Sequence, residues 1–383
     1  MLSHGTDRTS WDLFCRVVDN FGDAGIAWRL AKQLATDARL TVRLFVAGLD
    51  TLERIEPQAE ANRERQMLDR VEVVRWPSDD LPFTSVAAVV VELLGCGLPP
   101  PYLDAMERSS GPSTVWIDYE HLSAESWVSG YHGLPSPHPT RPLVKHFFYP
   151  GFSAATGGLL FEPGLGERRA AFLADPRAIE ALWHGLGLPA PAERELRLSL
   201  FAYDDAPIEA LLASLSEARD HRWTVVVPGG AGRVAIDRML VGSSDIPGSL
   251  IVRAVPFVDQ DTYDRLLWAC DVNFVRGEDS FVRAQAAGRP FVWQIYKQAA
   301  AAHRAKLLAF EDVYECELST EATVAQRALW HAWNEPAADL RPACSAWLAA
   351  RSTLAGHAEQ WRRRLAAEVP LIDRLLAFVA SRG

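Results

Sequence analysis

Short strand-like runs alternate with helix-like segments from the start of the chain, and the same alternation begins again near residue 195. The first half contains LFCRVV, LTVRLFVA, VEVVRW, VAAVVVELL and STVWIDYE, and the second LRLSLFAY, WTVVVPGG, SLIVRAVPF, CDVNFVRG and RPFVWQIY. Such alternation is typical of parallel βαβ units. We therefore predict an α/β fold with two Rossmann-like domains that face each other across a deep cleft, followed by C-terminal helices.

The stretch GLGLPAPAERE is rich in Pro, Gly and Ala and predicts a linker between the halves. The predicted domains are residues 10–184 and 195–355, and residues 356–383 are expected to form a helix that packs back toward the first domain. Residues 119–168 are rich in Pro, Gly and aromatic side chains, which predicts a long irregular segment. Such segments inside compact proteins are often functional.

Composition excludes several classes of protein. A chain of 383 residues favours two domains, and a formal charge of −10 argues against a general nucleic-acid binder. The five cysteines form no CxxC pair, which fits a reducing cytoplasm. The first residues lack the layout of a signal peptide, and the longest apolar run, VAAVVVELLGCGL, is too short to span a bilayer. We expect a cytoplasmic protein without nucleic-acid or membrane partners.

The segment FCRVVDNFGDAG places two carboxylates, Asp19 and Asp23, at the carboxyl end of the first predicted strand. Ligands bind at this edge in open α/β sheets. The pair could hold one cationic group or share a proton. Asp23 also precedes a helix predicted over about 26–37, so a purely structural role as the cap of that helix is the alternative for this residue.

The segment FVRGEDSFVRAQAAGRPFVWQIY predicts a strand, a glycine turn, a helix that begins near Ser280, and another strand. The helix N-terminus offers backbone N–H groups to a phosphate or diphosphate, and Arg276 can add a charge-assisted bond. Glu278 and Asp279 would repel a diphosphate unless they point to a sugar or to another group. An ordinary capped helix is the alternative interpretation.

Aromatic residues follow two other predicted strands, Phe201 and Tyr203 in one case and Phe257 in the other, with Gln260 close behind. A nucleobase binds well between aromatic faces, with an amide to read its edge. Core packing is the alternative for the two phenylalanines. The chain has no GxGxxG or GxSxG motif, and its histidines lack metal-ligand spacing, so we expect no metal site.

These residues indicate a two-domain enzyme that uses a nucleotide sugar, with its acids in one half and its phosphate site in the other. Glycosyltransferases with the GT-B fold have this layout. Several blocks are more specific: VVDNFGDAGIAWRLAKQLA, WIDYEHLSAESWV, GLPSP, FFYPGFSAATGGLL, FAYDDAP and NFVRGEDSFVRAQAAGRPFVWQIY. In these blocks the chain resembles the elongation factor P arginine rhamnosyltransferase family, from about Trp11 to the C-terminal helices.

The resemblance implies roles for individual residues. Asp19 and Asp23 fall on the family's two essential aspartates, with Asp23 favoured as the general base, and Glu278 falls on its essential glutamate. Phe201 and Phe257 correspond to aromatics that hold a thymine. The remaining positions expected around the nucleotide sugar are Gly22, Tyr203, Gln260, Arg276, Asp279 and Ser280.

The resemblance also implies a reaction. The donor would be dTDP-β-L-rhamnose, the acceptor an arginine on an exposed loop of the N-terminal domain of elongation factor P, and the product an inverted, α-linked rhamnosyl-arginine. Residues 10–184 would form the acceptor side and residues 195–355 the nucleotide-sugar side, without cofactor or metal. Two alternatives stay open: a GT-B glycosyltransferase with another nucleotide-sugar donor or a small-molecule acceptor, and a non-catalytic protein that binds nucleotide sugar or elongation factor.

Overall fold

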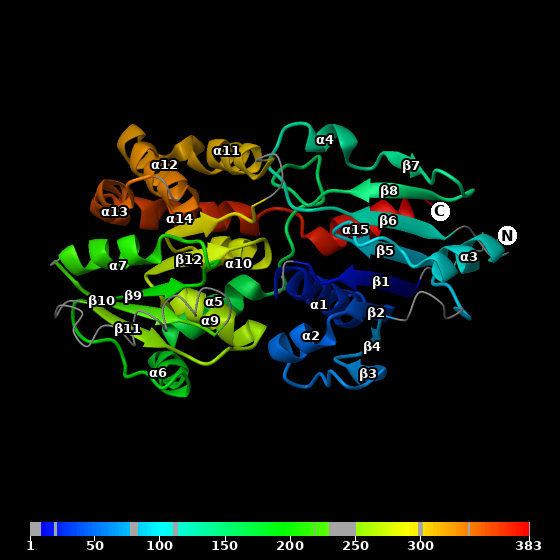
Figure 1. Ribbon diagram of the computed structural model, residues 1–383, viewed down its shortest axis with the longest axis horizontal. Helices are drawn as coiled ribbons and strands as arrows, with labels where there is room; N and C mark the ends of the chain where they lie inside the picture. Colours follow the sequence, from blue (N-terminus) through cyan, green and yellow to red (C-terminus); the bar gives the residue numbers. More distant parts are fainter. Residues whose placement is uncertain are drawn as a thin grey trace. The chain divides into compact units, whose positions relative to one another are not determined.

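The chain folds into two compact units, the first comprising Met1–Pro163 and Glu368–Gly383 and the second Gly164–Ala367 (Figure 1). The computed structural model describes residues 9–18, 21–76, 83–109, 114–218, 220–229, 250–297, 302–335 and 338–382. Within these ranges, no helix is long and apolar enough to cross a membrane.

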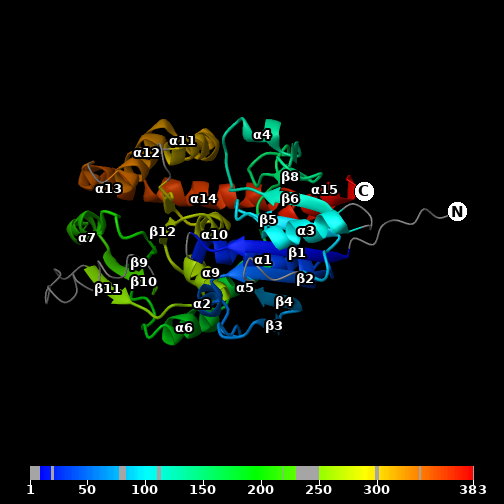
Figure 2. The same cartoon turned by 45° about the vertical axis from the view of Figure 1, so that its right-hand side comes forward.

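The described part of the first unit contains an eight-stranded sheet with the order β3-β4-β2-β1-β5-β6-β8-β7. Figure 2 shows this sheet from β3 to β8. Neighbouring strands from β4 through β8 pair in parallel, whereas the two edge strands, β3 and β7, pair antiparallel. The strands are β1 (Ser10–Arg16), β2 (Thr41–Ala47), β3 (Arg65–Leu68), β4 (Val71–Arg75), β5 (Val89–Leu93), β6 (Val115–Tyr119), β7 (Pro135–Pro137) and β8 (Val144–Phe148).

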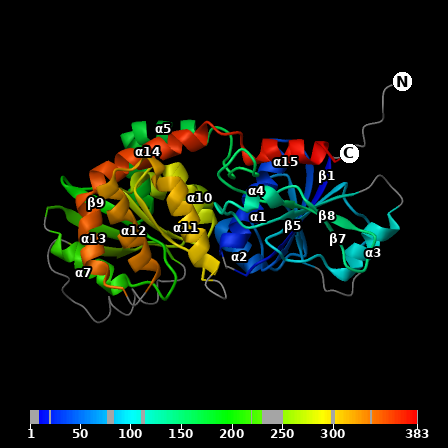
Figure 3. The same cartoon turned by 90° about the horizontal axis from the view of Figure 1, so that it is seen from above.

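Helices of the first unit connect these strands, and the last helix of the chain returns to it. They are α1 (Phe21–Thr36), α2 (Leu49–Ile55), α3 (Pro100–Arg108), α4 (Val128–Tyr131) and α15 (Leu371–Ala380). Helix α15 lies against α1 (Figure 3). Its position is fixed by Arg374, which donates to the carbonyls of Ser153 and Thr156 at 2.8 Å each.

The described part of the second unit contains a parallel five-stranded sheet with the order β11-β10-β9-β12-β13. Its strands are β9 (Glu195–Leu200), β10 (Arg222–Val227), β11 (Leu250–Ala254), β12 (Val272–Arg276) and β13 (Phe291–Gln294). All five correspond to strands predicted from the sequence. Parallel strands are covered on both faces, which explains why each reads as an apolar run.

The helices of the second unit include the C-terminal group that the sequence predicted. They are α5 (Leu165–Ala174), α6 (Pro176–Gly185), α7 (Ile208–Glu217), α9 (Gln260–Ala269), α10 (Asp279–Ala287), α11 (Ala302–Tyr314), the 3-10 helix η2 (Glu315–Glu317), α12 (Thr320–Asn334), α13 (Leu340–Ala349) and α14 (Arg351–Ala366).

The division between the units differs from the predicted bounds of 10–184, 195–355 and 356–383. Helices α5 and α6 belong to the second unit, where Arg169 donates to the carbonyl of Ala287 at 2.7 Å. Helix α14 also belongs there, because the indole of Trp361 donates to Gln285 at 3.0 Å. Only α15 and the residues beside it join the first unit.

Residues 119–168 are more ordered than the predicted irregular segment. Strand β8 inserts between β6 and β7 in the first sheet and pairs with β6 in parallel, so that Asp118 lies opposite Phe147. The sequence pattern was misleading because β8 (VKHFF) is short and half-buried, and because prolines and glycines flank it.

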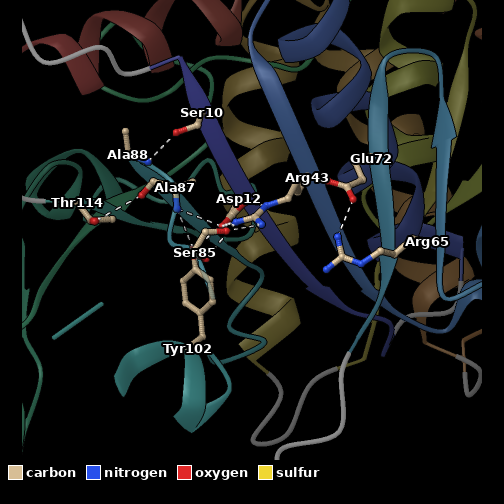
Figure 4. A network of polar contacts seen from close by, with 10 residues as sticks. All are labelled: Ser10, Asp12, Arg43, Arg65, Glu72, Ser85, Ala87, Ala88, Tyr102 and Thr114. Carbon is tan, nitrogen blue, oxygen red and sulfur yellow. Dashed lines mark hydrogen bonds and ion pairs between the residues drawn. The ribbon is translucent and has the colours of Figure 1, made fainter. Parts of the chain in front are cut away.

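A buried ion pair connects three elements of the first unit (Figure 4). Asp12 in β1 is 1% exposed and accepts bonds from the guanidinium of Arg43 in β2, at 2.6 and 2.5 Å, and from the hydroxyl of Tyr102 in α3 at 2.5 Å. The backbone N–H of Ala87 adds a fourth bond at 3.3 Å. A buried carboxylate is tolerated when it is paired and hydrogen-bonded in this way.

This network predicts a selective loss of stability. Arg43→Met leaves the Asp12 carboxylate buried without its cation, and we expect the free energy of unfolding to fall by about 3 kcal/mol. The matched control is Arg65→Met, because Arg65 is 61% exposed and pairs with Glu72 on the surface, where ion pairs contribute less than about 1 kcal/mol. Urea unfolding of both variants checks this; equal losses would contradict it.

Candidate active site

Three of the predicted side chains meet at one edge of the second sheet. Strands β9 and β12 are parallel neighbours, so their carboxyl ends lie side by side. Phe201 follows β9 directly, and its backbone N–H donates to the carbonyl of Phe274 in β12 at 2.9 Å. Tyr203 comes two residues later, and Arg276 is the last residue of β12. The parallel pairing brings the side chains together across 75 residues of sequence.

The Arg276 side chain is buried, at 5% exposure, against two aromatic rings. Its guanidinium carbon lies 4.5 Å from the ring centroid of Phe201 and 4.4 Å from that of Tyr203. Stacking on aromatic faces stabilises a cation and orients it, while the N–H donors stay in the guanidinium plane. Arg276 is therefore held in place and keeps its capacity to bind an anion.

Helix α10 begins three residues after β12 ends, at Asp279, one residue before the predicted start. Gly277 turns the chain with a φ of +61°, a backbone angle that favours glycine. The hydroxyl of Ser280 donates to the carbonyl of Arg276 and accepts from its N–H at 3.2 Å. Because this hydroxyl proton is already used to close the turn, Ser280 can serve an anion only through its backbone N–H.

Two acids accompany this helix N-terminus, as the sequence predicted. Glu278 and Asp279 are both half-buried, and the Glu278 side chain does not cap the helix. The positive end of the helix dipole and the Arg276 guanidinium favour negative charge at this point. This end of α10 therefore lacks the side-chain cap from Glu278 that an ordinary capped helix could have had.

Phe257 lies in the connection from β11 to α9, at the same edge of the sheet, and Gln260 is the first residue of α9; both are half-buried. A Cβ at Gly229, after β10, would lie 2.9 Å from the backbone nitrogen of Phe257, so this close approach requires glycine. Helix α9 also reaches the end of β9, because the ring of Tyr263 lies 5.7 Å from that of Phe201.

In the first unit, Asp23 is buried, at 6% exposure, in the first turn of α1. Its Oδ2 atom accepts a hydrogen bond from the backbone N–H of Val18 at 2.7 Å, which closes the loop between β1 and α1. Gly22 lies in the same turn. Asp19 lies outside the described residues, so the predicted pair is represented here by Asp23.

The start of α1 corrects a prediction. The helix begins at Phe21 and not near Ile26, so Asp23 is inside the first turn and does not precede the helix. Gly22 and Gly25 lower helix propensity by about 1 kcal/mol each relative to alanine, which makes the sequence read as a loop. Burial of this turn against the unit overrides the propensity, since Gly25 and Ile26 are both buried.

One lysine and two acids form a buried group of charges near the carboxyl edge of the first sheet, and the sequence did not predict a site there. Lys145 in β8 lies 2.7 Å from Asp118 in β6 and 3.6 Å from Glu92 in β5, and both acids are buried. Burial raises the pKa of Glu92 above its usual value. The sequence feature that could have indicated this group is Glu92, an acid within the apolar run that forms β5.

Gln294, at the end of β13, was also missed. Its side-chain oxygen accepts from the backbone N–H of Tyr203 at 2.8 Å, so it contacts the site directly. The predicted strand RPFVWQIY contained it, but its amide could not be distinguished from one that faces solvent. Gln294 could have been found from its position at the end of a parallel strand, directly opposite Arg276 in the neighbouring strand.

The second unit thus gathers an arginine, a helix N-terminus and several aromatic faces at one sheet edge. This combination suits an anionic ligand that also carries a flat ring. Throughout the described ranges, no three His, Cys, Asp or Glu side chains are grouped to hold a metal ion.

Comparisons with known proteins agree with this picture. Residues 11–380 match the family described as elongation factor P (EF-P) rhamnosyltransferase EarP. A protein-arginine rhamnosyltransferase of Pseudomonas putida is 43% identical over 97% of this chain and 98% of its own length. The enzyme of the same description from Pseudomonas aeruginosa is 43% identical over 85% of this chain and 87% of its own length.

A solved structure concerned with EarP-mediated arginine glycosylation of translation elongation factor EF-P is also similar. It has a TM-score of 0.67 and 33% identity, and the match covers 97% of this chain and 99% of that chain. The predicted GT-B fold, with two Rossmann-like units and C-terminal helices, is confirmed. The chain belongs to the EarP family of elongation factor P rhamnosyltransferases, and it is an enzyme of the protein-arginine rhamnosyltransferase class.

Proposed function

We propose that the chain transfers L-rhamnose from dTDP-β-L-rhamnose to an arginine side chain of EF-P, with inversion at the sugar carbon. The observation that carries the proposal is the Arg276 guanidinium, buried against two aromatic rings beside the N-terminus of α10, in a chain of the EarP family. The acceptor is a loop of the N-terminal domain of EF-P. Because EF-P is a translation factor, we expect the reaction to take place in the cytoplasm.

The donor occupies the edge of the second sheet in this proposal. Arg276 and the N-terminus of α10 bind the diphosphate, with Ser280 contributing through its backbone N–H. Phe257 and Phe201 hold the thymine, and Gln260 reads its edge. Tyr203 holds Arg276 in place. Asp279 and Gly22 complete the surroundings of the nucleotide sugar, and Glu278 contacts the sugar.

The acceptor guanidinium is protonated at physiological pH, so its nitrogen is a poor nucleophile. Asp19 and Asp23 grip its N–H groups and align one nitrogen with the anomeric carbon of the sugar. The buried Asp23 carboxylate, oriented by the N–H of Val18, is suited to such a fixed position. Two carboxylates also offset the positive charge that makes the guanidinium unreactive.

The reaction is a single displacement. The bond between the anomeric carbon and nitrogen forms as the bond between that carbon and the phosphate oxygen breaks, and the electron pair leaves with the diphosphate. The nitrogen becomes more acidic as it reacts, and Asp23 takes its proton as the general base. The helix N-terminus and Arg276 stabilise the negative charge that gathers on the departing dTDP. No metal takes part in this scheme.

The role of Asp23 predicts a loss of turnover without a loss of donor binding. We expect Asp23→Asn to lower the rate of EF-P modification by about 10²–10⁴-fold, because the amide cannot accept the proton. Intact mass of EF-P, after incubation with enzyme and dTDP-rhamnose, measures the product as one added deoxyhexose. The control is Asp50→Asn, which changes an exposed carboxylate in α2.

The outcomes for Asp23 separate the alternatives. If the wild type binds dTDP but adds no mass to EF-P, the acceptor is another molecule. If Asp23→Asn modifies EF-P at the wild-type rate, Asp23 is not the base.

The stacked arginine predicts a specific loss of donor affinity. Arg276→Lys keeps the charge but removes the planar donors that stack on Phe201 and Tyr203, so we expect the Kd for dTDP to rise about tenfold. Isothermal titration calorimetry with dTDP measures this. Arg265→Lys, on the exposed face of α9, should leave the Kd unchanged; comparable Kd values for both variants would contradict the assignment.

The scheme without metal predicts that chelation has no effect. We expect the rate of EF-P modification to remain within about twofold after dialysis against EDTA, because the diphosphate charge is offset by Arg276 and the helix N-terminus. A loss of activity that Mg²⁺ or Mn²⁺ restores would show that the leaving group needs a cation.

A further inference from the structure

Gln294 joins the two loops that form the edge of the second sheet. It is 1% exposed at the end of β13, and its Oε1 atom accepts from the backbone N–H of Tyr203 at 2.8 Å. Its Nε2 atom donates to Oδ1 of Asp205 at 3.0 Å. Its backbone carbonyl accepts from the N–H of Gly277 at 3.1 Å. One residue therefore bonds both to the loop after β9 and to the loop after β12.

The two partners of this side chain require an amide. The Tyr203 N–H can only donate, whereas the Asp205 carboxylate, which also pairs with Lys297, can only accept. A glutamate at position 294 would satisfy Tyr203 but place a second negative charge beside Asp205. A methionine would remove the acceptor of the Tyr203 N–H, and a shielded donor without a partner costs about 1–3 kcal/mol. The Asp205 side chain, which is 45% exposed, would keep its pair with Lys297.

The backbone at the end of β13 is fixed by hydrogen bonds to a residue of α12. Asn334 in α12 accepts from the backbone N–H of Ile295 at 3.0 Å and donates to the carbonyl of Trp293 at 2.8 Å. The indole of Trp293 donates to the carbonyl of Gly277 at 2.7 Å. Gln294 thus starts from a fixed backbone, and its side chain can define where the Tyr203 backbone lies.

We propose that Gln294 is a positioning residue of the donor site, which fixes the Tyr203 ring and, through it, the Arg276 guanidinium. This inference rests on the proposed function, since it assumes that dTDP binds at Arg276. The Tyr203 ring lies 4.4 Å from the guanidinium carbon, so a shift of its backbone removes one of the two faces on which Arg276 stacks. A purely stabilising role for Gln294 is the competing explanation.

The test compares two buried glutamines of the second unit. Gln326 is also 1% exposed, and it bonds to the indole of Trp347 at 2.6 Å and to the carbonyl of Phe291 at 3.5 Å, away from the site. We expect both Gln294→Met and Gln326→Met to lower the Tm. Only Gln294→Met should raise the Kd for dTDP and the KM for dTDP-rhamnose, by about tenfold.

A rescue pair keeps the test decisive if Gln294→Met folds poorly. Gln294→Glu should weaken dTDP binding, because two carboxylates then face each other. Adding Asp205→Asn to this variant supplies an amide that can donate to the carboxylate at position 294. The double variant should return the Kd to within about threefold of the wild type. Failure of this rescue would overturn the proposal, as would equal Kd values for the wild type and a folded Gln294→Met. If the wild type itself does not bind dTDP, the donor assignment is wrong, and the inference falls with it.

Discussion

The parallel pairing of β9 with β12, and of β12 with β13, is the constraint on which the functional part of the second unit depends. Parallel strands all end at one edge, so residues from three distant segments meet there without any long-range motif. Arg276 and Gln294 are the last residues of β12 and β13, and the aromatic rings of Phe201 and Tyr203 follow the last residue of β9. The proposed donor site is therefore a consequence of topology, and the individual side chains determine its chemistry.

The two units use buried charge differently. In the first unit, Asp12 receives four hydrogen bonds, and its cation lies directly against it. Every partner is supplied by the protein, so the network has no capacity left for a ligand and contributes to stability. Arg276, in contrast, is held by ring faces, which stabilise a cation without using up its in-plane donors. This difference distinguishes a structural ion pair from a charge kept ready for an anion.

Much of the fold and of the candidate site could be predicted from the sequence, because strands buried on both faces are recognisable as apolar runs between turns. All five described strands of the second unit and the turn before α10 were found in this way. The prediction failed where burial outweighs local propensity. Glycines made the first turn of α1 look like a loop, and prolines beside β8 made that strand look irregular. Helices α5 and α6 fall in the second unit, outside the bounds predicted for it, and the Arg169 bond to Ala287 that holds α5 there spans 118 residues. Gln294 was missed since its partner, a backbone N–H, has no sequence signature.

A glutamine at the end of β13 meets a specific need of the loop after β9. The site needs Tyr203 to stay rigid while its ring remains available to Arg276, so the constraint must act on the backbone and not on the ring. A side-chain oxygen that accepts from the Tyr203 N–H does this, and the amide nitrogen turned toward Asp205 determines which way the group faces. The loop is thereby fixed before any ligand binds, which is how a preorganised site limits the entropy lost on binding.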